Sequence, residues 1–303
     1  MTDVIKKYLF EDRSVRIESV HLTDTWLAAQ AHHDYPRAVA SLLGELVAAA
    51  VLLATNLKFD GSLLLQIQGD GAIALMVAEC RADLSVRATV KLRDQPLPDS
   101  GDLQTLLNPH GGARFIVVLD PPRNTPGRQA YQGIVPLEGD RISEALEQYM
   151  IRSEQLHTKI WLSADRQKCA GLLLQKMPIT GGNALTSEAA AEQSWERATA
   201  LSNTLTSQEL LETQQDTMIH RLFWEETLLG FEAQPITWKC SCTRERVIDM
   251  LKMLGQTEVD DILTEQGKIE VACEFCGKPY LFDAIDATSL FQAVTVADNK
   301  TLH

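Results

Sequence analysis

Four cysteines near the C-terminal end of this 303-residue chain have the spacing of a metal site. Cys240 and Cys242 form a Cys-x-Cys pair, and after 30 further residues Cys273 and Cys276 form a Cys-x-x-Cys pair. Four thiolates from two close pairs suit the closed tetrahedral coordination of Zn²⁺, which prefers sulfur and nitrogen ligands. We therefore expect one zinc ion per chain in the reduced form. The usual role of such a site is structural, but four oxidisable ligands, paired closely enough to form disulfides, also suit a redox switch.

Other reactive side chains give weaker signals. His32 and His33, beside Asp34, are adjacent, so their side chains diverge in a helix or a strand and predict no catalytic pair. Cys80 and Cys169 stand alone and are interpreted as small, partly buried residues. The sequence contains neither G-x-S-x-G nor the phosphate-binding pattern G-x-x-x-x-G-K-[ST]. We therefore expect that the chain is not an enzyme and has no catalytic residues.

Composition and charge limit the possible functions. The chain is 45% hydrophobic and 23% charged, as soluble globular proteins are. No uninterrupted apolar run of about 18 residues appears and the N-terminus is polar, so we expect no membrane span, no secretory signal and a cytoplasmic location. Of the net charge of −13, much lies in residues 183–235, with nine acidic and two basic residues, and in 236–287, with ten and six. This acidity argues against a nucleic-acid partner.

The cysteines must be positioned by a small domain, which we expect over residues 236–287. Thr243–Leu254 predicts a helix that turns Val247, Leu251 and Leu254 inward and ends at Gly255. A domain of about 50 residues is marginal without a covalent or metal crosslink, so the metal would hold it together.

A second helix and a hairpin complete the predicted scaffold. Thr257–Gln266 is expected to be helical, with Thr257 as N-cap and Gly267 just beyond its end. Ile269–Val271 and Tyr280–Phe282 alternate like the two strands of a hairpin that flanks the Cys-x-x-Cys pair.

Residues 1–178 predict a larger domain of α+β class, in which helices cover a mixed sheet. The long apolar stretch Pro36–Leu57 predicts one helix, and the amphipathic stretch Ile142–Ile151 predicts another. Strands are expected at Ser62–Gln68, Ala72–Glu79, Leu84–Leu92, Arg114–Leu119, Ala130–Val135, Thr158–Ser163 and Gly171–Gln175.

Beyond a break at Pro178–Gly182, residues 183–235 are predicted to form an α-helical linker. Ala184–Leu229 contains no proline or glycine, and the capping box Thr206-Ser-Gln-Glu209 starts a second helix within it. The linker has an apolar stripe that must rest on another surface, so we predict that it is metastable alone. The stripe comprises Leu210, Met218, Leu222, Phe223 and Leu229. Residues 288–303 are expected to form a C-terminal tail.

Segments along nearly the whole chain carry a resemblance to a known family. In the small domain and the linker they are Lys239-Cys-Ser-Cys-Thr-Arg-Glu-Arg246, Glu265-Gln-Gly267, Cys273-Glu-Phe-Cys276, Tyr280-Leu-Phe-Asp283 and His220-Arg-Leu-Phe-Trp-Glu-Glu226. In the first domain they are His33-Asp-Tyr-Pro36, Leu42-Leu-Gly-Glu45, Lys58-Phe-Asp-Gly-Ser62, Gln66-Ile-Gln-Gly-Asp-Gly71, Tyr131-Gln-Gly-Ile-Val-Pro-Leu137, Ser153-Glu-Gln-Leu156 and Ala170-Gly-Leu-Leu-Leu-Gln175. Together they resemble the redox-regulated 33-kDa bacterial heat-shock chaperones, which are zinc-dependent holdases. His157 stands where we expect proline and Cys169 where we expect alanine or glycine.

The resemblance implies a mechanism and a set of partners. Reduced protein would hold zinc and be inactive, whereas oxidants would form the disulfides Cys240–Cys242 and Cys273–Cys276 and release the ion. The linker would then unfold and expose an apolar surface for unfolded client proteins, without ATP, and the active form would be a homodimer. We expect the coupling to pass through the packing of Leu222, Phe223 and Leu229 of the linker on the first domain.

Two other classes of function stay open. A static zinc-containing adaptor for protein binding would keep both its zinc and its partner under oxidation. A thiol–disulfide oxidoreductase that uses Cys273 and Cys276 would turn over a disulfide substrate, although it would not explain the pair Cys240 and Cys242.

Overall fold

The computed structural model describes residues 3–56, 61–97, 101–122, 129–178 and 186–298, with side chains described as far as residue 291. Most of the predicted break at Pro178–Gly182, most of the segment Lys58–Ser62 and the end of the predicted tail lie outside these ranges. The chain divides into two compact units, Met1–Lys239 and Cys240–His303, and each is described by itself.

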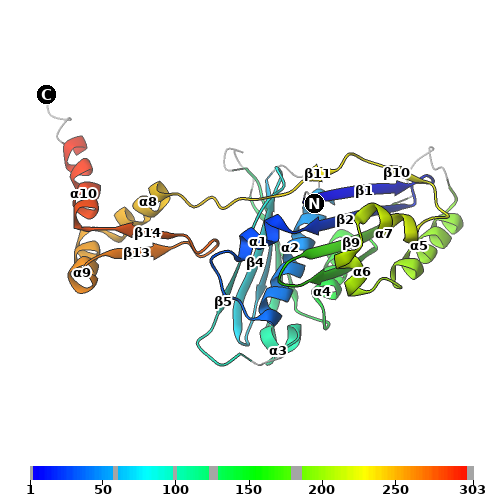
Figure 1. The fold of residues 1–303 in the computed structure, drawn as a ribbon, viewed down its shortest axis with the longest axis horizontal. Helices are drawn as coiled ribbons and strands as arrows, with labels where there is room; N and C mark the ends of the chain where they lie inside the picture. Colours follow the sequence, from blue (N-terminus) through cyan, green and yellow to red (C-terminus); the bar gives the residue numbers. More distant parts are fainter. Residues whose placement is uncertain (1–2, 57–60, 98–100, 123–128, 179–185, 299–303) are drawn as a thin grey trace. The chain divides into compact units, whose positions relative to one another are not determined.

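Two six-stranded sheets form the larger unit (Figure 1). The first has the strand order β10-β1-β2-β9-β8, with β11 also paired to β1, and the second has the order β12-β5-β4-β3-β6-β7. All neighbours are antiparallel except β12 and β5. The strands are β1 Val4–Phe10, β2 Val15–Leu22, β3 Ser62–Gln68, β4 Ile73–Arg81, β5 Ser85–Leu92, β6 Arg114–Asp120, β7 Tyr131–Pro136, β8 Thr158–Ala164, β9 Cys169–Lys176, β10 Leu228–Gly230, β11 Gln234–Pro235 and β12 Thr237–Trp238.

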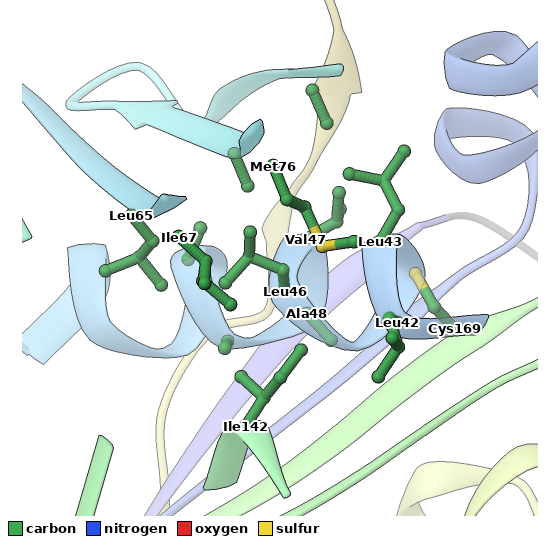
Figure 2. Packing of buried hydrophobic residues seen from close by; sticks show 14 of the residues in the cluster. Leu42, Leu43, Leu46, Val47, Ala48, Leu65, Ile67, Met76, Ile142 and Cys169 are labelled. Carbon is green, nitrogen blue, oxygen red and sulfur yellow. The ribbon is translucent and has the colours of Figure 1, made fainter. Parts of the chain in front are cut away.

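Helix α2, Arg37–Asn56, lies in the core and contacts strands of both sheets. In Figure 2, Leu65, Ile67 and Met76 lie on one side of it and Ile142 lies on the opposite side. Gly44 permits this packing, because a Cβ atom there would come within 2.5 Å of the Cβ of Ala164 on β8. By length and composition alone α2 is apolar enough to cross a membrane, but 67% of its most apolar stretch is buried inside the fold.

Shorter helices complete this core: α1 Asp24–Gln30, α3 Leu103–Leu107 and α4 Ile142–Tyr149. A π-helical turn, Met150–Glu154, continues α4 and ends at Gln155 in the left-handed conformation. The predicted helix Ile142–Ile151 and the seven predicted strands are all present, with ends that differ by at most two residues. The α+β class predicted from the sequence is confirmed, but the strands form two sheets rather than one, with only β12 and β5 parallel among the described strands.

The linker forms three helices, α5 Glu188–Ser202, α6 Ser207–Glu212 and α7 Gln215–Leu222, which lie on the first sheet. The predicted capping box at Thr206 and Glu209 is present at the start of α6. The prediction of helix as far as Leu229 is wrong, because the chain turns after Phe223 and continues as the strand β10. Pairing with β1 there overrides a local preference for helix.

The smaller unit consists of the helices α8 Arg244–Leu254 and α9 Gln256–Gln266, the hairpin of β13 Ile269–Ala272 and β14 Pro279–Phe282, and α10 Ala284–Asp298. Its own core includes Leu251, Val259, Tyr280 and Phe282. Residues 288–298 of the predicted tail are helical, because they continue α10. Leu290 of this helix belongs to the same core.

Three details of the predicted small domain differ in the structure. Leu254 is 48% exposed rather than turned inward. Thr257 lies within α9, whose N-cap is Gly255, since α8 and α9 follow each other with a single glycine at a φ of 95° between them. The unit begins at Cys240 rather than at residue 236, because Ile236 is buried in the large core and Trp238 pairs with β5.

Candidate metal centre

The first cysteine pair lies immediately before a helix. Cys240 and Cys242 precede α8, and the side chain of Thr243 caps that helix by accepting a hydrogen bond from the amide of Arg246. The Arg246 guanidinium in turn donates to the carbonyl of Ser241 at 2.7 Å. These two contacts fix the backbone between the thiols and the helix.

The second pair lies in the turn of the β13–β14 hairpin. The amide of Cys273 donates to the carbonyl of Lys278 at 3.0 Å, and the amide of Gly277 donates to the carbonyl of Cys273 at 2.8 Å. Gly277 has a φ of 66°, in the left-handed region that glycine adopts without strain. A tight turn of this kind brings the thiols of Cys273 and Cys276 to the same side of the chain.

The four thiols meet in one cluster. Their sulfur atoms all lie within 4.8 Å of one another, with 3.6 Å between Cys240 and Cys273 and 3.4 Å between Cys242 and Cys276. A tetrahedron with Zn–S bonds of about 2.3 Å has sulfur atoms roughly 3.8 Å apart. The structure therefore brings together all four predicted ligands, at a spacing that suits a metal ion bound between them.

The electrostatics of the cluster also suit a cation. Burial raises the pKa of the Cys240 and Cys276 thiols. Burial also acts on Cys242, but its interactions with the Tyr280 hydroxyl and the neighbouring thiols outweigh it and lower its pKa to about 7. Since adjacent thiolates repel each other, four can be ionised together only with a positive ion among them.

The hydroxyl of Tyr280 indicates a metal site independently of the sulfur distances. The hydroxyl is buried and has no hydrogen-bond partner of normal geometry, although it interacts with Cys242. A buried hydroxyl without a partner costs free energy, whereas a metal-bound thiolate would be a good acceptor for it. The sequence places Tyr280 on the hairpin but does not reveal this contact, because a tyrosine in a strand is usually a packing residue.

Comparisons with known proteins agree with this geometry. The sequence pattern of the Hsp33 protein family matches residues 3–283. The 33 kDa chaperonins of Chromobacterium violaceum and Methylobacillus flagellatus are each 43% identical to this chain, over 97% and 100% of it and 96% and 99% of the relatives. The chain belongs to the Hsp33 family. The resemblance predicted from the sequence is thus confirmed, and these relatives are named as chaperonins rather than as enzymes.

A solved structure supports the fold. The crystal structure of the 33 kDa chaperonin from Thermotoga maritima matches 98% of this chain and 100% of that chain with a TM-score of 0.79, at 22% sequence identity. The 33 kDa chaperonin of Pseudomonas aeruginosa is 42% identical over 96% of this chain and 95% of its own length. The Hsp33 fold therefore extends over both compact units.

In the part of the chain that the structure describes, side chains outside the cluster do not form a second group of potential metal ligands. Cys80 and Cys169 are fully buried in the large unit, far from any other thiol in the sequence. His33 stacks on Tyr35, with ring centroids 4.9 Å apart, and forms no part of a metal-binding group with His32. Among the described residues, the only group of three or more potential ligands is the tetracysteine cluster.

A second feature of this Hsp33-family chain is the contact between its linker and the first sheet. Four of the five predicted stripe residues, Leu210, Met218, Leu222 and Phe223, are buried in one apolar cluster with Phe10 and other side chains of the sheet. Phe223 packs edge-on against Phe10 with ring centroids 5.8 Å apart. Leu229, the fifth, is 43% exposed on β10, so its assignment to the stripe is wrong.

Polar contacts also tie helix α7 to the sheet. The buried side chain of Gln215 donates to the carbonyl of Ser19 at 2.8 Å. Asp216 accepts hydrogen bonds from the Lys6 ammonium, at 2.7 Å, and from the Tyr8 hydroxyl, at 2.8 Å. These contacts could not be predicted from the sequence, because the partners are about 200 residues apart.

Proposed function

We propose that this chain is an ATP-independent holdase chaperone that oxidation of its tetracysteine site switches on. The observation that carries the proposal is the clustering of four oxidisable thiols in a unit with a small core, in a chain whose linker covers an apolar sheet face. Its membership of a family of proteins named 33 kDa chaperonins supports the binding of unfolded clients.

In the reduced form, Cys240, Cys242, Cys273 and Cys276 would hold one Zn²⁺ ion. When bound, zinc supplies a crosslink between the start of α8 and the hairpin, and structural zinc contributes on the order of 10 kcal/mol to the folding of such units. A core as small as that of residues 240–290 has little other stability to offset the loss of such a contribution.

In the oxidation step, each pair of thiolates gives two electrons to one molecule of peroxide. One S–S bond forms and the peroxide O–O bond breaks, and with two protons the oxygen atoms leave as two molecules of water. Two such steps consume all four metal donors, so the site can no longer retain the ion.

The pairing that we propose, Cys240–Cys242 and Cys273–Cys276, rests on the family resemblance. Sulfur contacts of 3.6 Å for Cys240–Cys273 and 3.4 Å for Cys242–Cys276 join one pair to the other, so proximity does not select the proposed pairing. Peptide mapping of the oxidised protein by mass spectrometry would identify the bonds that form.

The remaining steps would follow from unfolding of the smaller unit. The linker would be released from the first sheet, and its apolar side chains and those of the sheet would bind unfolding proteins in the cytoplasm. The active species would be a homodimer, which analytical ultracentrifugation of oxidised and reduced samples can test.

The decisive experiment measures light scattering from a thermally unfolding client, with reduced chain in one sample and peroxide-treated chain in the other. A chelating dye follows zinc release in parallel. Suppression of aggregation only after oxidation, together with zinc release, is the expected result. Equal behaviour of both samples, or retention of zinc after oxidation, would favour a static adaptor. Catalytic turnover of a disulfide substrate would favour an oxidoreductase that uses Cys273 and Cys276.

A further inference from the structure

The outer edge of strand β1 is occupied by the C-terminal end of the linker. Strands β10 and β11 pair with β1 in antiparallel register, with Leu229 opposite Leu9 and Gln234 opposite Ile5. The amide of Glu11 donates to the carbonyl of Thr227 at 3.0 Å. Without the linker, β1 would be the edge strand of the first sheet.

The backbone groups on this edge alternate with groups that face β2. Glu11 and Lys7 bond outward, since the carbonyl of Lys7 accepts from the amide of Phe231 at 3.0 Å. Bonded pairs in an antiparallel ladder recur at every second residue, so Ile5 and Leu9 also face outward. The amides of Lys6 and Tyr8 face β2 instead.

The segment on this edge is held through its backbone and through one partly buried side chain, Leu228, which packs against the apolar cluster under the linker helices. The side chains of Leu229 and Phe231 are 43% and 58% exposed, so they contribute little burial to the contact. Recognition through main-chain hydrogen bonds depends weakly on sequence. The edge therefore suits other extended segments as well as the chain's own linker.

An apolar sheet face adjoins this edge. Side chains of β1, β2 and β9 that lie under the linker helices are apolar and buried, among them Phe10, Ile17, Leu172 and Leu174. Tyr8 packs against the same cluster. Because side chains alternate along a strand, a segment added to β1 would place every second side chain over this face.

We infer that, after release of the linker, the outer edge of β1 binds an extended segment of an unfolded client as an added antiparallel strand. The partner is a polypeptide with apolar residues at alternate positions, whose backbone pairs with Ile5, Lys7 and Leu9. Exposed strand edges are general templates for such pairing, and folded proteins usually cover them. This inference rests on the proposed function for the release of the linker.

The test uses a synthetic peptide with the sequence of residues 226–236 and the oxidised full-length protein. A matched control peptide carries N-methyl groups on the amides that correspond to Leu229 and Phe231, so that its side chains are unchanged but two ladder bonds cannot form. The unmodified peptide is expected to bind oxidised but not reduced protein, and the control to bind roughly tenfold more weakly. Equal affinities, or no binding to oxidised protein, would overturn the inference.

Hydrogen exchange on complexes with a thermally unfolded client gives a second readout. The amides of Ile5, Lys7 and Leu9 are expected to lose protection on oxidation and regain it with client, while those of Lys6 and Tyr8 stay protected as an internal reference. If the client is kept soluble but the outward amides stay unprotected, only the edge inference fails. If oxidation never suppresses aggregation, the proposed function fails.

Discussion

Six thiols are present in this chain, and their surroundings divide them into two groups. The four clustered thiols are partly exposed, whereas Cys80 and Cys169 are fully buried. Burial raises the pKa of the Cys80 thiol to about 12 and that of Cys169 well above its usual value. In the cluster, Cys242 has a lowered pKa and all four thiols are accessible, and since the thiolate is the reactive form, oxidants should react with the cluster first.

We predict that replacing both buried cysteines, Cys80→Ala and Cys169→Ala, leaves the metal site unchanged. Zinc content and the rate of zinc release by peroxide should equal those of the wild type, and the larger unit should lose about 1 kcal/mol of stability per substitution. A chelating dye and denaturant unfolding measure these quantities. Slower zinc release in the double variant would place a buried thiol in the oxidation chemistry.

At the scale of elements, the docking of the linker depends on Phe223, which is only 2% exposed and packs against Phe10. We predict that Phe223→Asp makes the reduced, zinc-loaded protein an active holdase, because burying an unpaired carboxylate costs several kcal/mol and favours the undocked linker. The matched control is Leu229→Asp, at a position 43% exposed, which should leave the reduced protein inactive. Aggregation assays on both reduced variants test this, and an inactive Phe223→Asp variant would show that coupling does not pass through this contact.

His21 lies beneath the linker in a cavity of about 330 Å³ between the first sheet and residues 211–215. Its Nε2 atom is buried and has no hydrogen-bond partner among the described residues. Burial, followed by the nearby charge of Lys168, lowers its pKa to about 4, against a smaller opposing effect of the Leu210 backbone. The charged groups that line the cavity are Asp3, Lys6, Lys168 and Glu212, with Asp216 paired to Lys6.

The pKa of His21 predicts that acid weakens linker docking. A histidine with a pKa of about 4 when docked and about 6.5 when free binds its proton more tightly in the undocked state. Docking is therefore unaffected well above pH 6.5 and weakens as the pH falls from 6.5 towards 4. At pH 5 the equilibrium constant for docking should be roughly 30-fold smaller than at neutral pH.

Hydrogen-exchange protection of α6 and α7 between pH 7.5 and 5 measures the effect. The variant His21→Gln should lose this pH dependence, whereas His220→Gln, at an exposed position on α7, should keep it. Zinc content is followed in every sample, because acid also protonates the metal ligands. The same pH dependence in His21→Gln as in the wild type would exclude His21 as its source.

Elements with a strong local signal were predicted well from the sequence. The helix at Arg37–Asn56, the hairpin beside Cys273 and the capping box at Thr206 all have local residue patterns that determine them. Strands β1 and β2 were not predicted, and in β2 the alternation of apolar and polar residues is broken at Glu18 and Ser19, which are both buried. Strand β10 was predicted as helix because its structure depends on pairing with a strand more than 200 residues earlier.

For the candidate metal site, the clustering of the four cysteines could be predicted because their type and spacing are chemically specific. What could not be predicted was the hydroxyl of Tyr280 facing them, or the exposure of Leu254, since both depend on how α8, α9 and the hairpin pack. The contacts of Gln215 and Asp216 with the first sheet could not be predicted for the same reason, because these residues meet partners that are far apart in sequence only in the folded chain.

At the scale of the whole molecule, each of the two units has its own apolar core. We predict that removing zinc with a chelator under reducing conditions unfolds the smaller unit and leaves the larger sheets folded. Hydrogen exchange should show loss of protection in residues 240–290, with little change in β2, β4 and β9. Loss of protection in those strands would mean that the two units unfold together.

The order of strands in the first sheet has a consequence for recovery after stress. Strand β2 pairs with β9 across about 150 intervening residues, and such long-range pairing makes folding slow. The hairpin and helices of the smaller unit, in contrast, join residues close in sequence and can form quickly. If the sheets stay folded while the smaller unit opens, resetting the protein needs only the fast steps. The time for inactivation would then be set by reduction of the disulfides and return of the metal rather than by refolding of the chain.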